Sequence, residues 1–309
     1  MNATTPTGNG AGEHVGPLVS PARLAALLEE GAGRVIPFDA SVGAHRGAAA
    51  RIPGARPFDL DGRLSDHASA LPHTMPGAEE FTEELRALGV HDGDTLVVYD
   101  AQGVYSSARA WWMLRAMGAG RVAVLDGGLP AWTAAGLPVE PAPAAYEGPR
   151  GTFTARPVTG MFADADTVAA ALADPSAAVL DARSAGRYAG TAPEPRPGLR
   201  GGHMPGSASL PFGRLQRDGG TMRPARELRT EIEAAAGDRE RLYLSCGSGV
   251  TACVLALGAT LAGYRDLTVY DGSWSEWGLP SARPVATGES PGGSGTSGGS
   301  GASCAGGAS

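Results

Sequence analysis

Residues 241–261 read RLYLSCGSGVTACVLALGATL. The first five, 241–245, form a short apolar run that predicts a buried β-strand. Residues 251–261 are apolar over a helical length and predict an α-helix, while the glycine-rich residues 246–250 form the turn between them. Cys246 therefore lies where a strand ends and a helix begins. Ligands bind at this edge of parallel α/β sheets, so Cys246 is a candidate functional residue.

The two loop glycines, Gly247 and Gly249, let the backbone turn tightly and point successive N–H groups inward. The helix that follows adds the positive end of its dipole. Such a cradle stabilises an anion, and the thiolate of Cys246 is the anion that the sequence supplies. We therefore predict that Cys246 is a nucleophile able to carry sulfur as a persulfide. The alternative is a buried, inert cysteine at the end of a strand.

The chain contains two copies of one plan. Each copy has a strand ending near an aspartate, a Pro-Gly turn, a second strand followed by a loop and a helix, and a closing Asp-Gly segment. These landmarks keep their order in both halves, at 35–39, 52–55, 95–100 and 126–132 and again at 179–181, 204–207, 242–246 and 271–277. Short strands that alternate with helices predict an α/β fold, with a mainly parallel sheet and helices on both faces in each copy.

The first copy has Asp100 where the second has Cys246. Aspartate cannot carry sulfur, so we expect the first copy to be catalytically silent and to contribute a wall of the cleft. Residues 138–163 are rich in proline, alanine and glycine and predict a linker. The predicted organisation is a disordered N-terminus at 1–17, a silent domain at 18–137, the linker at 138–163, a catalytic domain at 164–285 and a disordered Gly/Ser-rich tail at 286–309.

Composition excludes several kinds of partner. The 309 residues carry 25 basic and 32 acidic side chains, and this net charge of -7 gives no reason to bind nucleic acid or an anionic membrane. The N-terminus lacks the features of a signal peptide, and no run is long enough to span a bilayer. Three cysteines without regular spacing make no disulfide framework, so we expect a reducing, cytoplasmic setting. We expect Cys253 in the core and Cys304 to be an incidental thiol of the tail.

The sequence resembles a known family over roughly residues 18–285. The loop Cys-Gly-Ser-Gly-Val-Thr-Ala at 246–252 is similar to that of 3-mercaptopyruvate sulfurtransferases in the tandem rhodanese superfamily. Further similar strings occur at 71–76, 109–115, 181–188 and 193–196. The resemblance implies two rhodanese-like domains with no metal and no organic cofactor. It also implies transfer of sulfur from a small-molecule donor to cyanide or to a thiol acceptor, such as thioredoxin or a low-molecular-weight thiol.

The resemblance also assigns site residues. Cys246 and Ser248 are expected to be catalytic, and Arg187 and Arg196 to hold the carboxylate and keto oxygen of the substrate. Two guanidinium groups could clamp a 2-keto acid and stabilise the charge that develops as a pyruvate enolate leaves. The alternative is that both are surface arginines of a proline-rich loop. Four further loop residues are assigned to substrate binding, namely Gly247, Gly249, Val250 and Thr251, although the Thr251 hydroxyl is more simply expected to cap the following helix.

The loop favours one donor over another. Thiosulfate sulfurtransferases place cationic side chains here to meet a dianion, whereas this loop is neutral apart from the thiolate and carries hydroxyls on Ser248 and Thr251. We therefore expect 3-mercaptopyruvate, with thiosulfate as the alternative donor of the same persulfide. Relatives have a histidine before the first Ile-Pro-Gly-Ala, proposed to act in a relay with the residue that corresponds to Ser248. Here that residue is Arg51, so we expect no such relay, and Arg51 either attracts the substrate or forms a surface salt bridge.

Other classes of function are weaker alternatives. A phosphatase on this fold needs an arginine six residues after the nucleophile, where this chain has Ala252. A non-catalytic binding module would have lost Cys246, and a zinc site has too few ligands. His203 lies in the turn of the second copy, where we expect it to fix the backbone rather than to assist Cys246.

Overall fold

The computed structural model describes residues 15–31, 33–47, 49–141 and 145–288, and its chain forms two parallel sheets of five strands each. The first sheet has the order β1-β6-β5-β2-β4. Its strands are β1 (Leu18–Val19), β2 (Val35–Asp39), β4 (Arg56–Pro57), β5 (Thr95–Tyr99) and β6 (Val122–Leu125). Four helices accompany them: α1 (Pro21–Glu30), α2 (Ala78–Ala87), α3 (Ser107–Ala116) and α4 (Gly128–Ala134).

The second sheet repeats this plan with the order β10-β9-β11-β12-β8. Its strands are β8 (Phe162–Ala163), β9 (Ala177–Asp181), β10 (Ala208–Ser209), β11 (Arg241–Ser245) and β12 (Asp266–Tyr270). Its helices are α5 (Ala165–Ala173), α6 (Ala185–Ala189), α7 (Ala225–Ala236), α8 (Ala252–Leu261) and α9 (Ser273–Trp277). Read from the opposite edge, the strand order matches that of the first sheet, so the predicted α/β fold with two copies of one plan is confirmed.

Helices cover both faces of each sheet because alternate residues of a strand point to opposite sides. In β5, Leu96 and Val98 join the hydrophobic cluster under α2 and α3, while Val97 and Tyr99 join the cluster under α1 and α4. Both faces of β5 are buried, which explains why this strand is a continuous apolar run rather than an alternating one. Strand β5 ends at Tyr99, so Asp100 lies at the carboxyl ends of the strands of this sheet.

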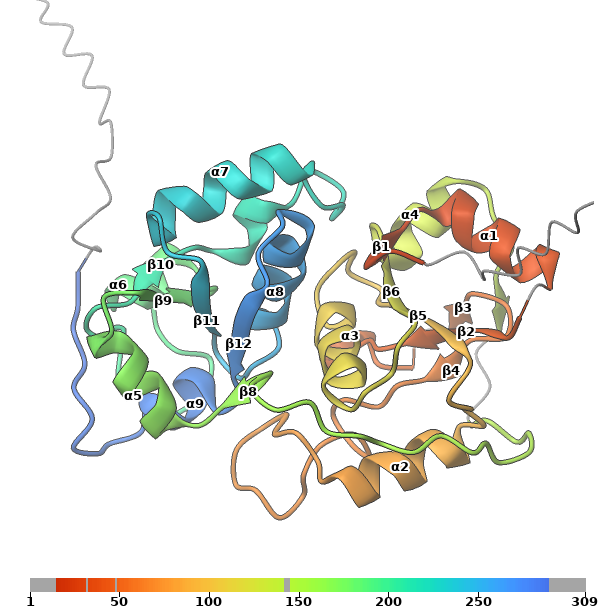
Figure 1. The fold of residues 1–309 in the computed structure, drawn as a ribbon, viewed down its shortest axis with the longest axis horizontal. Coiled ribbons are helices and arrows are strands. Elements are labelled where there is room, and N and C mark those ends of the chain that lie inside the picture. Colours follow the sequence, from red (N-terminus) through yellow and green to blue (C-terminus); the bar gives the residue numbers. More distant parts are fainter. Residues whose placement is uncertain (1–14, 32, 48, 142–144, 289–309) are drawn as a thin grey trace, which may run out of the picture.

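The two domains meet through α3 and α8, which face each other at the centre of the molecule (Figure 1). Nearly all residues of both helices are buried, as expected of helices that are apolar on every side. Residues of α3 and α8 belong to one continuous hydrophobic cluster. The second sheet, through α8, is therefore held against the first domain by a shared core.

The first domain is joined to the second by the chain that follows β7 (Glu140–Pro141). The short strands β3 (Ala50–Arg51) and β7 pair antiparallel, and the chain that follows runs along α2 before it reaches β8 (Figure 1). Phe153 of this connection is buried against Phe81 of α2, with ring centroids 6.4 Å apart. Within the described residues, no helix is both long and apolar enough to cross a membrane.

The predicted disordered ends fall largely outside the described residues, and Cys304 does so too. Three boundaries need correction. The carbonyl of Pro17 accepts the backbone N–H of Val124 and Val15 packs on the first domain, so residues 15–17 belong to that domain. Phe162–Ala163 form β8 of the second sheet, so the linker ends before them. Ala286 pairs with His203 through two backbone hydrogen bonds of 2.8 and 2.9 Å, and Gly288 donates to the carbonyl of Ala189. Residues 286–288 therefore belong to the second domain and not to the tail.

Candidate active site

Cys246 lies directly after β11, in the turn that leads into α8, and is 1% exposed. The hydroxyl of Ser273 accepts hydrogen bonds from the backbone N–H groups of Cys246 and Gly249, both at 3.1 Å, and donates to the carbonyl of Tyr270 at 2.8 Å. Ser273 itself has a φ of 48°, which is rare for a residue with a side chain. The loop is thus fastened at two points to the neighbouring turn after β12.

The equivalent loop of the first domain shows what such a cradle holds. The carboxylate of Asp100 is fully buried and accepts from the backbone N–H groups of Gln102, Tyr105 and Ser107, at 2.8, 2.9 and 2.9 Å. The silent copy therefore fills its own anion cradle with a fixed carboxylate. This accounts for the absence of a reactive group there without any change of fold.

In the second copy the donors that correspond to those of Gln102 and Tyr105 are the backbone N–H groups of Ser248 and Thr251. Within the described part of the chain these two groups donate to no acceptor, and neither does that of Val250, whereas the N–H of Cys253 donates to the carbonyl of Val250 at 3.1 Å. Together with the N-terminus of α8, these groups can stabilise negative charge on Cys246 or on a sulfur atom bound to it.

A cavity of about 290 Å³ opens over Cys246. The second domain contributes most of its lining, and the first domain adds Val42, His73 and Tyr105, so the silent copy does form one wall. The cavity brings together seven of the eight residues that the sequence assigned to the site: Cys246, Gly247, Ser248, Val250, Thr251, Arg187 and Arg196.

The two arginines of the cavity are held differently. Arg187 forms an ion pair with Glu194 at 2.6 Å, and the buried Glu194 is shared with Arg183 at 2.8 Å. Arg196 makes a longer hydrogen bond, with its Nη1 3.4 Å from the hydroxyl of Ser275. Neither is an ordinary surface arginine, because both lie within the cavity of Cys246. Their guanidinium groups can meet a small anion there.

The structure brings to Ser248 a histidine that the sequence did not lead us to expect. The Nδ1 atom of His73 lies 3.0 Å from Ser248 Oγ, and its Nε2 lies 2.9 Å from Asp61 Oδ1. A carboxylate only accepts, so Nε2 carries a proton and Nδ1 is left to accept from the hydroxyl. The expectation that replacement by Arg51 removes the relay is therefore wrong, because the histidine comes from another segment.

His73 belongs to the long loop between β4 and α2, which reaches over the second domain (Figure 1). Its neighbour Met75 donates a backbone hydrogen bond to Asp271 at 2.8 Å, which fixes the loop across the domain boundary. The string at 71–76 resembles that of relatives and contains this histidine, so the signal was present. Its partner could not be derived, because an irregular loop carries no periodicity that predicts its contacts.

Burial lowers the pKa of His73, and the nearby Arg109 and Arg196 act in the same direction, against the raising effect of Asp61. His73 is therefore neutral at pH 7, the state in which Nδ1 can accept a proton. The pKa of Asp61 is also lowered, since its hydrogen bonds from Gly43 and His73 outweigh its burial. Asp61 stays ionised and fixes the tautomer of the ring.

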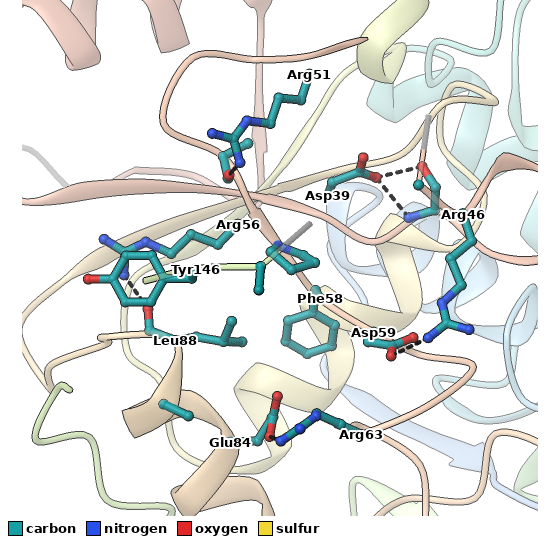
Figure 2. Close-up of a pocket in the computed structure, with 16 residues that line it drawn as sticks. Asp39, Arg46, Arg51, Arg56, Phe58, Asp59, Arg63, Glu84, Leu88 and Tyr146 are labelled. Atoms are coloured by element: carbon teal, nitrogen blue, oxygen red, sulfur yellow. Dashed lines mark hydrogen bonds and ion pairs between the residues drawn. The ribbon is translucent and has the colours of Figure 1, made fainter. Parts of the chain in front are cut away.

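Arg51 lies elsewhere. It binds Glu140 at 2.6 Å, which joins β3 to β7, and so the salt-bridge alternative is confirmed. Figure 2 shows it at a second cavity, of about 520 Å³, formed by the first domain and by Tyr146 of the connecting segment. The other arginines of this cavity are also paired, namely Arg46 with Asp59, Arg56 with the carbonyl of Leu88, and Arg63 with Glu84.

Two loop assignments need correction. Gly249 does not line the cavity: it has a φ of 75°, and a Cβ there would meet the carbonyl of Asp271 at 2.8 Å. It shapes the loop instead of contacting a substrate. Thr251 is the residue before α8, but its side chain makes no capping hydrogen bond, so its hydroxyl remains available to the cavity.

The remaining candidates are structural. Cys253 is buried, its thiol donates to the carbonyl of Gly249 at 3.2 Å, and burial raises its pKa to about 12. The ring of His203 stacks on Tyr188 with centroids 3.8 Å apart, and its Nδ1 contacts the carbonyl of Tyr188. The predictions of a core cysteine and of a histidine that fixes its turn are confirmed.

With this geometry in place, comparison with known proteins decides the family. The rhodanese-like domain matches residues 20–135 and again residues 164–279. The chain belongs to the rhodanese family. This tandem rhodanese also has curated relatives along most of its length. The thiosulfate/3-mercaptopyruvate sulfurtransferase 1 of Arabidopsis thaliana, a mitochondrial protein, is 41% identical over 261 residues, which is 78% of this chain and 69% of the relative.

Two further relatives are also described as 3-mercaptopyruvate sulfurtransferases. The 3-mercaptopyruvate sulfurtransferase of Homo sapiens is 41% identical over 241 residues, covering 75% of this chain and 78% of the relative. Among solved structures, the 3-mercaptopyruvate sulfurtransferase SseA from Escherichia coli matches with a TM-score of 0.74 and 35% identity, over 85% of this chain and 100% of that chain. This tandem rhodanese is therefore a sulfurtransferase. A phosphatase is also excluded by the site, because Ala252 is the fully buried first residue of α8.

Proposed function

We propose that the protein takes sulfur from 3-mercaptopyruvate onto Cys246, releases pyruvate, and passes the sulfur to a thiol or to cyanide. The observation that carries this proposal is the content of one small cavity. It holds the buried Cys246, two arginines able to bind a 2-keto acid, and the hydroxyl of Ser248 backed by His73. The name of the human relative gives the same donor, and the name of the Arabidopsis relative gives both donors.

In the first half-reaction, the thiolate of Cys246 attacks the sulfur of the donor. A sulfur–sulfur bond forms, the carbon–sulfur bond breaks, and its electron pair leaves with the carbon as pyruvate enolate. The proton of the donor thiol ends on that carbon, which becomes the methyl group of pyruvate. The total charge is unchanged, because one thiolate is replaced by one persulfide anion.

The proton needs a route, and three side chains provide one. Ser248 and His73 both line the cavity, and Nδ1 of His73 can accept a proton from the Ser248 hydroxyl while Asp61 holds Nε2. His73 takes the proton of the donor thiol through the Ser248 hydroxyl and returns it to the enolate carbon. Arg187 and Arg196 stabilise the enolate and carboxylate charges during this step.

In the second half-reaction, an acceptor thiolate or cyanide attacks the outer sulfur of the persulfide. The sulfur–sulfur bond breaks, the thiolate of Cys246 is restored, and the product is an acceptor persulfide or thiocyanate. Thioredoxin or a low-molecular-weight thiol suits the first type of acceptor. A reducing compartment, the cytoplasm, suits this cycle, because Cys246 must return to the thiolate after each turnover.

Comparison of the two donors tests the proposal. We expect wild-type protein, given a reduced thiol, to release pyruvate from 3-mercaptopyruvate faster than it releases sulfite from thiosulfate at equal concentrations. The cavity has a proton route that only the first donor needs, and its loop lacks the cations that would meet a dianion. Initial rates of the two products measure this. A faster sulfite release would reverse the donor assignment.

The same proton route predicts a pH dependence. Protonated His73 cannot accept a proton, so the kcat/KM for 3-mercaptopyruvate divided by that for thiosulfate should fall on acidification. Both donors react with the same nucleophile, so any effect of pH on Cys246 itself cancels in this ratio. Because burial lowers the pKa of His73, the fall should begin below the ordinary histidine value of 6.5. Asp61 raises this pKa, so the Asp61→Asn variant should move the fall to still lower pH. A ratio independent of pH would refute the role of His73.

A further inference from the structure

Tyr105 is a side chain of the first domain that lines the cavity over Cys246. It lies in the loop between β5 and α3, five residues after Asp100, and so corresponds to Thr251 of the second copy. Thr251 lines the same cavity. The equivalent loops of the two domains therefore place side chains of the same position into one site.

The loop that carries Tyr105 is fixed on both sides. Within the first domain, the backbone N–H of Tyr105 donates to the buried carboxylate of Asp100 at 2.9 Å. Across the domain boundary, the carbonyl of Val104 accepts from the side-chain amide of Gln216. The ring of Tyr105 meets that of Phe212 edge to face, with centroids 5.6 Å apart. The carboxylate that replaces the nucleophile in the first domain thus helps to hold an aromatic side chain at the site of the second.

The hydroxyl of Tyr105 has no partner in the structure. No group within residues 15–31, 33–47, 49–141 and 145–288 forms a hydrogen bond with it. A tyrosine hydroxyl that is removed from bulk water usually finds a partner, and the cavity is the place left for one.

The charges around this hydroxyl keep it protonated. Burial raises the pKa of Tyr105, and the negative charge of Cys246 acts in the same direction, against the lowering effect of Arg187 and Arg196. The phenol therefore keeps its proton at neutral pH and can donate a hydrogen bond. It also lies close enough to the sulfur and to both arginines to act on the same bound anion.

The keto oxygen of 3-mercaptopyruvate is the acceptor that fits this position. The donor's sulfur must meet Cys246 and its carboxylate suits the arginines, so the keto group lies between these two ends. Its oxygen is uncharged in the ground state and gains charge only as the enolate forms, so a hydrogen bond to it strengthens in the transition state. The oxygens of thiosulfate carry charge both before and after sulfur transfer, so a hydrogen bond to them stabilises both states alike.

We propose that Tyr105 is a catalytic residue supplied by the silent domain: its hydroxyl donates a hydrogen bond to the keto oxygen of a 2-keto-acid donor and stabilises the enolate that leaves. This inference rests on the proposed function, because it concerns the carbon fragment of that donor. The phenol keeps its proton throughout, so the bonds, electrons and charge of the half-reaction balance as before.

Single-turnover kinetics of the Tyr105→Phe variant test the proposal. Mixing without an acceptor isolates the first half-reaction, in which pyruvate or sulfite is released. We expect the limiting rate constant for pyruvate release to fall about 10- to 100-fold, the value of one hydrogen bond to a charged group. The half-saturating concentration of 3-mercaptopyruvate and the rate constant for sulfite release should change little. Phenylalanine keeps the ring and its contact with Phe212, so the variant should fold.

Tyr264→Phe is the matched control. Tyr264 is buried beyond the end of α8 that lies away from Cys246, and its ring stacks with Arg229 at 4.1 Å. Its hydroxyl also lacks a hydrogen-bond partner among the described residues. This replacement removes the same group outside the site and should change neither rate constant.

Three results would overturn the role of Tyr105. Equal losses with both donors would mean that the replacement disturbs the loop or the nucleophile. A higher half-saturating concentration with an unchanged limiting rate constant would mean that the hydroxyl binds only the ground state. Unchanged kinetics with both donors would mean that the hydroxyl does not contact the keto oxygen.

The failures of the two proposals are distinguishable. If wild-type protein releases no pyruvate from 3-mercaptopyruvate, the proposed function fails. If wild-type protein does so but Tyr105→Phe affects both donors alike or neither of them, only the role of Tyr105 fails.

Discussion

The Cys246→Ser variant should lose sulfur transfer from 3-mercaptopyruvate and from thiosulfate alike, by about 1,000-fold or more, because both donors require the same sulfur nucleophile. A serine hydroxyl is not ionised at neutral pH and cannot form a persulfide. The variant should keep the fold, since the replacement is close in size and the backbone N–H of Cys246 donates to Ser273 at 3.1 Å, whereas the thiol has only a 4.0 Å contact with the same hydroxyl. Pyruvate and sulfite release measure the loss.

Cys253→Ser is the matched control for this prediction. Its thiol is buried beneath the same loop and donates to the carbonyl of Gly249, a contact that a serine hydroxyl can also make. We expect this variant to retain transfer with both donors. A loss in Cys253→Ser equal to that in Cys246→Ser would mean that the cysteines act through packing of the loop and not through one nucleophile.

Replacement of the two arginines should give the second large effect. Arg187→Gln and Arg196→Gln should each lower kcat/KM for 3-mercaptopyruvate about 10- to 100-fold, the value of one hydrogen bond to a charged group. KM should rise because the carboxylate loses a partner, and kcat should fall because the enolate charge is less stabilised. Pyruvate release over a range of donor concentrations separates these two effects.

Arg241→Gln controls for the loss of a positive charge. Arg241 starts the same strand that ends before Cys246, and it pairs with Asp266 at 2.9 Å on the surface. Its replacement should leave kcat/KM unchanged. If the variants of Arg187 and Arg196 were also unchanged, the two arginines would not bind the donor, and the cavity would need another explanation.

The sequence predicted the parts of this protein that are governed by regular patterns. The strand and helix around Cys246 are found at Arg241–Ser245 and Ala252–Leu261, because apolar runs of these lengths can be buried only in a few ways. The difference between the two copies followed from Asp100, whose carboxylate fills the cradle in place of a thiol. Arg187 and Arg196 were found through resemblance alone.

The parts that were missed depend on contacts between distant segments. The pairing of His73 with Ser248 joins residues 175 positions apart through a loop without regular structure. The ion pair of Arg109 with Asp271 depends on how α3 meets the second sheet, which no local pattern specifies. Arg51 misled the interpretation because the resemblance placed the relay histidine at that position, whereas Arg51 lies at the β3 and β7 pair and the histidine comes from the loop before α2.

The most direct test of the account is the intact mass of the protein after 3-mercaptopyruvate is added without an acceptor. We predict a gain of one sulfur atom per chain, release of one pyruvate per chain, and loss of the added mass when a reduced thiol or cyanide follows. The Cys246→Ser variant should show no gain. Added sulfur that persists in Cys246→Ser, or pyruvate released by wild-type protein with no gain in mass, would contradict Cys246 as the sulfur carrier.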